Sequence, residues 1–274
     1  VRMFSVSLFN FILHINFRRM FFLFFRLVLA GCKTGTEVDS LTASAGAVPV
    51  MTSYIDEEDY LSLLDDRFSN TNVDIVFGYK DHKYNGTVEA QGAGTRYFSR
   101  WSYRIHLKDG TSVEGLTDFN LGAQITDRSM LRTELASALY RAEGFPVFSS
   151  NYALLSLNSH NEGLYLIIER IDSSFYRRRA IPLQELVKVG FGSHFSFNIP
   201  NYPPRNFSKE IPNDANLNNL SDLIHALDIT SDDQVFTEIS KYLNIPEYLR
   251  YHAMTSVIRA QDNFHNNFYL YKTF

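Results

Sequence analysis

The order of the periodic segments constrains the fold of this chain most, because strand-type patterns fill its first part and helix-type patterns its last part. Trp101–Leu107 alternates apolar and polar residues with a period of two, which is typical of a half-buried strand. Further strands are expected at Val73–Tyr79, Lys83–Gln91, Tyr152–Leu157 and Leu164–Ile168, and helices after Asp127 and at Leu217–Leu227, Asp232–Leu243 and Pro246–Gln261. This segregation predicts an α+β fold with a β-rich N-terminal lobe and a mainly helical C-terminal lobe.

Composition restricts the class of protein. Of the 274 residues, 45% are hydrophobic and 20% are charged, which excludes a disordered or low-complexity chain. The formal net charge of −4 argues against wholesale nucleic-acid binding, so no nucleic-acid partner is expected. The single cysteine, Cys32, excludes an intramolecular disulfide and a thiolate zinc cluster.

The N-terminal stretch is typical of a targeting signal. Two arginines precede an apolar run, Phe21–Gly31, which is too short to span a bilayer of about 30 Å. Leu29–Cys32 resembles the bacterial lipobox, whose cysteine carries lipid. We therefore expect a lipoprotein signal peptide over 1–32 with lipidation at Cys32, a flexible linker over 33–53 and one domain over 54–274. The alternative is an apolar N-terminal helix with a buried cysteine.

Helix boundaries and faces follow from caps and spacing. Asp127 is a suitable N-cap for a helix whose apolar stripe includes Leu131, Leu135 and Leu139. Leu249, Ala253, Val257 and Ala260 are expected to form the buried face of the last helix. Phe175–Leu186 is expected to be helical in part, and Phe191–Pro212 is expected to be a loop.

The most polar short connection, Gln261–Asn267, separates the last expected helix from a final strand. Asp262 and Asn267 repeat the D-x-x-x-x-N gap of the protein-kinase catalytic loop. There the Asp accepts the proton of the acceptor hydroxyl, and the Asn gives a neutral oxygen to a magnesium ion. Two simpler interpretations remain open: asparagines that cap the helix C-terminus, and asparagines that allow a left-handed turn.

Four stretches in order resemble the spore-coat CotH kinase family. They are GAGTRYFSRWSYRIHL at Gly92–Leu107, DRSMLR at Asp127–Arg132, a hairpin with NSHNEGLY at Asn158–Tyr165 and ERID at Glu169–Asp172, and QDNFHNNFYLY at Gln261–Tyr271. The resemblance implies an atypical protein-kinase-like bilobal fold. It also implies an ATP-dependent kinase that uses Mg²⁺ and phosphorylates serine in secreted or surface proteins. With the lipobox, it implies a lipid-anchored, extracytoplasmic protein of the bacterial cell envelope.

The resemblance also implies site residues. Asp262 becomes the catalytic acid/base, and Asn267 the magnesium ligand, with Asn266 as its rival. Arg100 falls where the family has a phosphate-contacting lysine, which is a departure, and Gln91 stands where the family often has arginine. Glu169 is expected either to face the nucleotide or to end the hairpin, and Lys188 either to contact phosphate or to be solvated.

The C-terminal end carries a further expectation. The family has a Trp-Asp-x-Asp segment with a second metal-binding aspartate soon after the final strand, and the sequence stops before it. We expect a C-terminally truncated domain that transfers no phosphate by itself, because one asparagine cannot hold Mg²⁺ against its water shell.

Two other functions stay open. The first is a non-catalytic surface lipoprotein that uses the same fold as a binding or scaffold module, which the Arg100 and Gln91 departures favour. The second is an unrelated hydrolase built on Asp262 and His265, and no nucleophile elbow or metal-ligand trio supports it.

Overall fold

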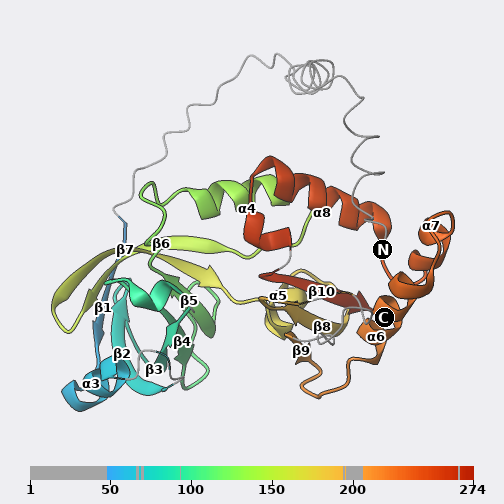
Figure 1. Ribbon diagram of the computed structural model, residues 1–274. Helices are drawn as coiled ribbons and strands as arrows, with labels where there is room; N and C mark the ends of the chain where they lie inside the picture. Colours follow the sequence, from blue (N-terminus) through green and yellow to red (C-terminus); the bar gives the residue numbers. More distant parts are fainter. Residues whose placement is uncertain are drawn as a thin grey trace, which may run out of the picture. The chain divides into compact units, whose positions relative to one another are not determined.

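The computed structural model describes residues 48–274, apart from 66–67, 69–70, 93, 194, 196–205 and 265 (Figure 1). The expected signal peptide, Cys32 and most of the expected linker lie outside the described residues. Residues 48–274 form one compact unit. In this described part, no helix combines the length and the apolar character that crossing a membrane requires.

A closed barrel of seven strands forms the first part of this unit. Its strands are β1 (Val50–Tyr54), β2 (Val73–Tyr79), β3 (His82–Gln91), β4 (Ser102–Leu107), β5 (Asp118–Gly122), β6 (Ser150–Leu157) and β7 (His160–Glu169). They lie in the order β1-β2-β3-β4-β5-β7-β6, and β1 pairs parallel with β6 to close the barrel. The strands expected from the sequence are confirmed as β2, β3, β4, β6 and β7, and β1 and β5 complete the ring.

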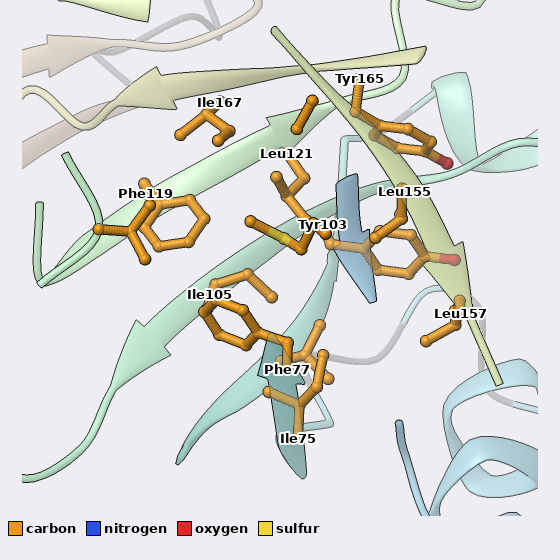
Figure 2. Close-up of a cluster of buried hydrophobic side chains, with 14 of the residues drawn as sticks. Ile75, Phe77, Tyr103, Ile105, Phe119, Leu121, Leu155, Leu157, Tyr165 and Ile167 are labelled. Carbon is orange, nitrogen blue, oxygen red and sulfur yellow. The ribbon is translucent and has the colours of Figure 1, made fainter. Parts of the chain in front are cut away.

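Alternate side chains of these strands fill the barrel interior (Figure 2). Phe77, Ile105, Phe119, Leu121 and Tyr165 are each at most 2% exposed. Burying a side chain of this size contributes roughly 1.5–3 kcal/mol, so the shared interior is the main source of stability for the barrel. Tyr165 also donates its hydroxyl to the Trp101 carbonyl at 3.0 Å, which satisfies its one buried polar group.

Short helices connect the strands. They are α3 (Glu57–Asp65), the 3₁₀ turn η1 (Gly94–Tyr97) and α4 (Arg132–Ala142). The helix expected from Asp127 therefore begins later, at Arg132. Asp127 instead stabilises the preceding turn, because its carboxylate accepts from the Ser129 backbone N–H at 3.1 Å and the Arg132 N–H at 2.8 Å. Hydrogen bonds, first of all from the Ser129 hydroxyl, lower the pKa of the Asp127 carboxyl.

The C-terminal part contains a second sheet. It has the order β10-β8-β9, with β8 (Leu183–Val189), β9 (Phe207–Ile211) and β10 (Phe268–Thr273) all antiparallel to their neighbours. Helices α5 (Ser173–Arg178), α6 (Asn218–Ile229), α7 (Val235–Ile239) and α8 (Ile245–Val257) and the 3₁₀ turn η2 (Gln261–Phe264) accompany it (Figure 1).

The predicted fold class is therefore wrong. We predicted an α+β, kinase-like bilobal fold with a mainly helical C-terminal lobe, whereas the structure has a closed barrel, a second sheet and few helices. Part of the difference lies at β8 and β9. The sequence predicts that Phe175–Leu186 is helical in part, and α5 confirms this up to Arg178, but a strand begins at Leu183. The expected loop Phe191–Pro212 contains the strand Phe207–Ile211, which pairs with β8.

The predicted buried face of the last helix is also wrong. Leu249 is 51% exposed and Val257 is 65% exposed. Thr255 is fully buried instead, and its hydroxyl lies 2.7 Å from the Tyr140 hydroxyl of α4. The rings of Tyr140 and Tyr251 stack at 5.9 Å between centroids. Helix α8 thus meets α4 through a polar and aromatic side rather than through its aliphatic stripe.

This contact yields a prediction for the substitution Tyr140→Phe. The change keeps the ring stack and removes the hydroxyl that faces Thr255, so we expect it to lower the free energy of unfolding by about 1 kcal/mol. Urea denaturation of the single variants and of the double variant with Thr255→Val gives the coupling between the two side chains. Additive effects of the two substitutions would mean that the hydroxyls do not interact.

Candidate functional site

The polar segment Gln261–Asn267 connects α8 to β10 and contains the two residues of the D-x-x-x-x-N spacing. Helix α8 starts at a defined place, because Asn244 Oδ1 accepts from the Glu247 N–H at 3.2 Å and Pro246 stands in the first turn. The Tyr251 hydroxyl then donates to the Asn263 carbonyl at 2.8 Å and fixes η2 against the helix. Asp262 lies in η2, and its side chain, like the whole of His265, lies outside the described residues.

Asn266 and Asn267 differ in their freedom to bind a ligand. Asn266 Oδ1 accepts from the Asn267 N–H at 2.8 Å, and the same N–H also donates to the Val189 carbonyl at 3.0 Å. Asn267 is exposed and has a φ of 58°, in the left-handed region that asparagine tolerates. Its carboxamide makes no hydrogen bond within the described part of the chain. Asn267 is therefore the better placed of the two rivals to offer an oxygen to an external group.

Lys188 lies on β8 next to Val189, whose carbonyl accepts the hydrogen bond from the Asn267 N–H. It is directly opposite Tyr269 of β10 and Ser208 of β9 in the register, and its side chain is exposed. The sheet thus brings the backbone of Lys188 close to Asn266 and Asn267, although no hydrogen bond joins their side chains within the described residues.

Arg100 is held by the barrel. One terminal nitrogen donates to the Leu164 carbonyl of β7 at 2.5 Å, and the guanidinium carbon lies 4.8 Å from the centroid of the Tyr165 ring. Its buried Nε has no hydrogen-bond partner among the described residues. These contacts join Arg100 to the β6–β7 hairpin, and none of them leads to Asn266 or Asn267.

Glu169 ends β7 as the centre of an ion cluster. It is 2% exposed and accepts from Arg178 Nη2 at 2.5 Å, from Arg179 Nη2 at 2.6 Å and from the Ser149 N–H at 2.7 Å. Burial alone would raise the pKa of the Glu169 carboxyl. The bonds from Arg179, the Ser149 N–H and Arg178 outweigh it and lower the pKa to about 2. The cluster ties the end of the barrel to α5.

The predicted residues therefore fall into two groups. Lys188, Asn266 and Asn267 meet where β8 and β10 pair, with Asp262 on the preceding turn. Arg100 and Glu169 stand on β7 or against it, in contacts that fasten parts of the fold together. No hydrogen bond or ion pair among the described residues connects the two groups.

A charged network on the outer face of the barrel was not among the residues that the sequence motifs indicate. Arg104 donates to Asp118 at 2.6 Å and to Glu89 at 3.2 Å, and Arg170 lies 3.2 Å from Asp118. Glu89 and Arg104 are direct partners in the β3–β4 register. Opposite charges at outward positions of adjacent strands were the signal that could have revealed this network.

Comparison with known proteins defines the class of this chain. Residues 88–273 match the family model described as CotH kinase protein, which covers more than half of the chain. The chain therefore belongs to the CotH kinase protein family, and the resemblance expected from the sequence is confirmed.

A named relative gives a second comparison. The chain is similar to the inner spore coat protein H of Bacillus subtilis (strain 168), with 20% identity over 234 residues. The match takes in 82% of this chain and 64% of the relative, so the chain spans less than two thirds of the relative's length.

Proposed function

We propose that this protein is an ATP-dependent protein kinase of the CotH type that phosphorylates serine residues of secreted or surface proteins. Membership of the CotH kinase protein family supports this activity. The observation that carries the proposal is the placement of Asp262 and Asn267, five residues apart, on the connection between α8 and β10. The same spacing in protein kinases combines a hydroxyl-orienting carboxylate with a metal-binding amide.

Each residue has a separate chemical task in this proposal. Asp262 accepts the proton of the serine hydroxyl and orients its oxygen. Asn267 offers its carboxamide oxygen to Mg²⁺, because the oxygen of Asn266 already accepts from the Asn267 N–H. Mg²⁺ held at Asn267 would offset part of the negative charge of the triphosphate. Lys188 adds positive charge on the neighbouring strand.

The carboxamide oxygen of Asn267 is suited to a metal ion that binds together with its nucleotide. Within the described residues no cluster of three histidine, cysteine or acidic side chains could hold a metal ion. A single neutral amide binds Mg²⁺ weakly unless phosphate oxygens supply further ligands. The proposed metal is therefore part of a Mg-ATP complex.

Location and partners are part of the same proposal. The relative is named as a spore coat protein, which supports a place at the cell or spore surface. Lipidation of Cys32, outside the described residues, would tether the domain to a membrane, with surface proteins as its serine substrates.

The two asparagines yield a prediction. Replacing Asn267 with alanine is expected to weaken Mg-ATP binding by about tenfold, whereas Asn266→Ala changes it by less than about threefold. Thermal unfolding with increasing Mg-ATP measures the apparent affinity of each variant. A larger loss in Asn266→Ala would assign the metal to that residue instead.

The second candidate is a binding or scaffold module without catalysis. The contacts of Arg100 and Glu169 favour it, because both side chains are already engaged within the fold. Thermal unfolding of the full-length natural protein separates the candidates, since a kinase is stabilised by Mg-ATP and a pure scaffold is not.

A further inference from the structure

A cavity of about 210 Å³ lies beside the candidate site and is lined mainly by aromatic rings. Its walls include Tyr140, Phe145, Tyr251, Phe268 and Tyr271, which come from α4, the connection after it, α8 and β10. Phe145 and Tyr251 lie 6.3 Å apart between ring centroids, and Tyr251 and Phe268 lie 5.8 Å apart. The rings therefore form a continuous aromatic wall.

Glu247 is the carboxylate in this lining. Its Oε1 accepts from the Tyr271 hydroxyl at 3.2 Å, and its Oε2 accepts from Asn244 Nδ2 at 3.1 Å. Both donors are neutral, and the described residues provide no ion pair to Glu247. Glu247 and Tyr271 also line two neighbouring hollows of about 320 and 590 Å³. Among the described residues, the negative charge of Glu247 therefore has no positive partner where these three hollows meet.

The aromatic groups here already attract cations from the chain itself. The Arg250 guanidinium lies 5.1 Å from the Phe145 ring centroid, and the Arg179 guanidinium lies 3.7 Å from the centroid of Phe175, which also lines the cavity. The negative faces of aromatic rings favour a cation within about 6 Å. A positive ligand would therefore find both a carboxylate and rings in this cavity.

We propose that the cavity binds a trimethylammonium group, with its positive charge near Glu247 and its methyl groups against the aromatic rings. A primary ammonium would lose three hydrogen bonds to water and would regain few, because the lining offers mostly rings. A quaternary ammonium donates no hydrogen bond and is weakly hydrated, so it loses little on entering.

The size of the cavity agrees with a small ligand. Pockets for drug-sized molecules measure about 300–1,000 Å³, so 210 Å³ suits one small cationic group rather than a nucleotide. Because Asn263 and Asn267 also line it, the ligand would lie beside the candidate catalytic segment. The binding itself requires no phosphotransfer and does not depend on the proposed kinase activity.

Titration of the protein with choline, followed by NMR or calorimetry, tests this proposal. The neutral isostere 3,3-dimethylbutan-1-ol, in which carbon replaces the nitrogen, is the matched ligand control. We expect saturable binding of choline and at least tenfold weaker binding of the alcohol. Glu247→Gln should weaken choline binding about tenfold while the variant unfolds at a similar temperature. Glu57→Gln, which removes the same charge from exposed helix α3, should have no effect.

Three results would overturn the proposal. Equal binding of choline and its neutral isostere would mean that the cavity recognises shape alone. Unchanged choline affinity in Glu247→Gln would remove the carboxylate from the site. Absence of saturable choline binding to the folded wild-type protein would leave the cavity without this ligand.

Discussion

Replacing Glu169 with glutamine is expected to lower the free energy of unfolding by about 3 kcal/mol, the lower end of the range for breaking a buried ion pair. The substitution keeps the size of the side chain but leaves Arg178 and Arg179 without their shared negative partner. The lower end applies because the Arg178 side chain is 38% exposed and solvent screens part of its charge. Urea denaturation at pH 7 measures the change.

A matched control separates this effect from a general loss of charge. Glu57→Gln removes a carboxylate from the exposed first turn of α3, and we expect it to change the free energy of unfolding by less than about 0.5 kcal/mol. Equal effects of the two substitutions would contradict the role of Glu169 in joining the barrel to α5.

The same cluster predicts a pH dependence with a definite sign. The pKa of Glu169 is lowered from 4.5 to about 2 in the folded protein, so its stabilisation is complete above pH 4.5. It decreases as the pH falls from 4.5 towards 2, because the unfolded chain then binds a proton at Glu169 that the folded carboxyl does not yet bind. The stability difference between wild type and Glu169→Gln should therefore shrink between pH 4.5 and 2. A constant difference over this range would contradict the lowered pKa.

Replacing Asp262 with asparagine is expected to lower the rate of phosphate transfer by about 10²–10⁴, the usual contribution of a general base. Asparagine has almost the same shape but cannot take the proton of the acceptor hydroxyl. Binding of Mg-ATP should change far less, because the nucleotide contacts assigned to Asn267 remain. Asp232→Asn, at an exposed position after α6, is the matched control and should keep full activity.

The barrel could be predicted from the sequence in large part. The alternation of apolar and polar residues at Trp101–Leu107 indicates which side chains face the interior, and it can be recognised within a few consecutive residues. The hairpin turns were also visible: Lys80 and Asp81 adopt left-handed φ angles of 47° and 62° where the sequence breaks between two strands. Closure of the ring was not visible, because the parallel pairing of β1 with β6 joins residues about a hundred positions apart.

The C-terminal part was predicted less well. Helical spacing at Leu249 and Val257 indicated a buried face, but burial depends on the elements that pack against a helix, and the described residues leave both side chains exposed. Strand β9 follows residues rich in asparagine and proline, and this composition concealed it. Pairing with β8 decided its structure.

The candidate site also combines features that a short stretch of sequence reveals with contacts that depend on tertiary packing. The spacing of Asp262 and Asn267 is local, so the sequence alone could propose it. The contact of Arg100 with Leu164 joins residues 64 positions apart, and the pairing of Glu169 with Arg179 depends on how α5 follows β7. Such contacts arise from tertiary packing, and no motif in the sequence predicts them.

Transfer of labelled γ-phosphate from ATP to serine, by the full-length natural protein with Mg²⁺ and a mixture of surface proteins, tests the central claim most directly. The proposed function predicts labelled phosphoserine with the wild-type protein and at least a hundredfold less with Asp262→Asn at equal stability. Equal labelling by the two proteins, or no labelling by either, would contradict it.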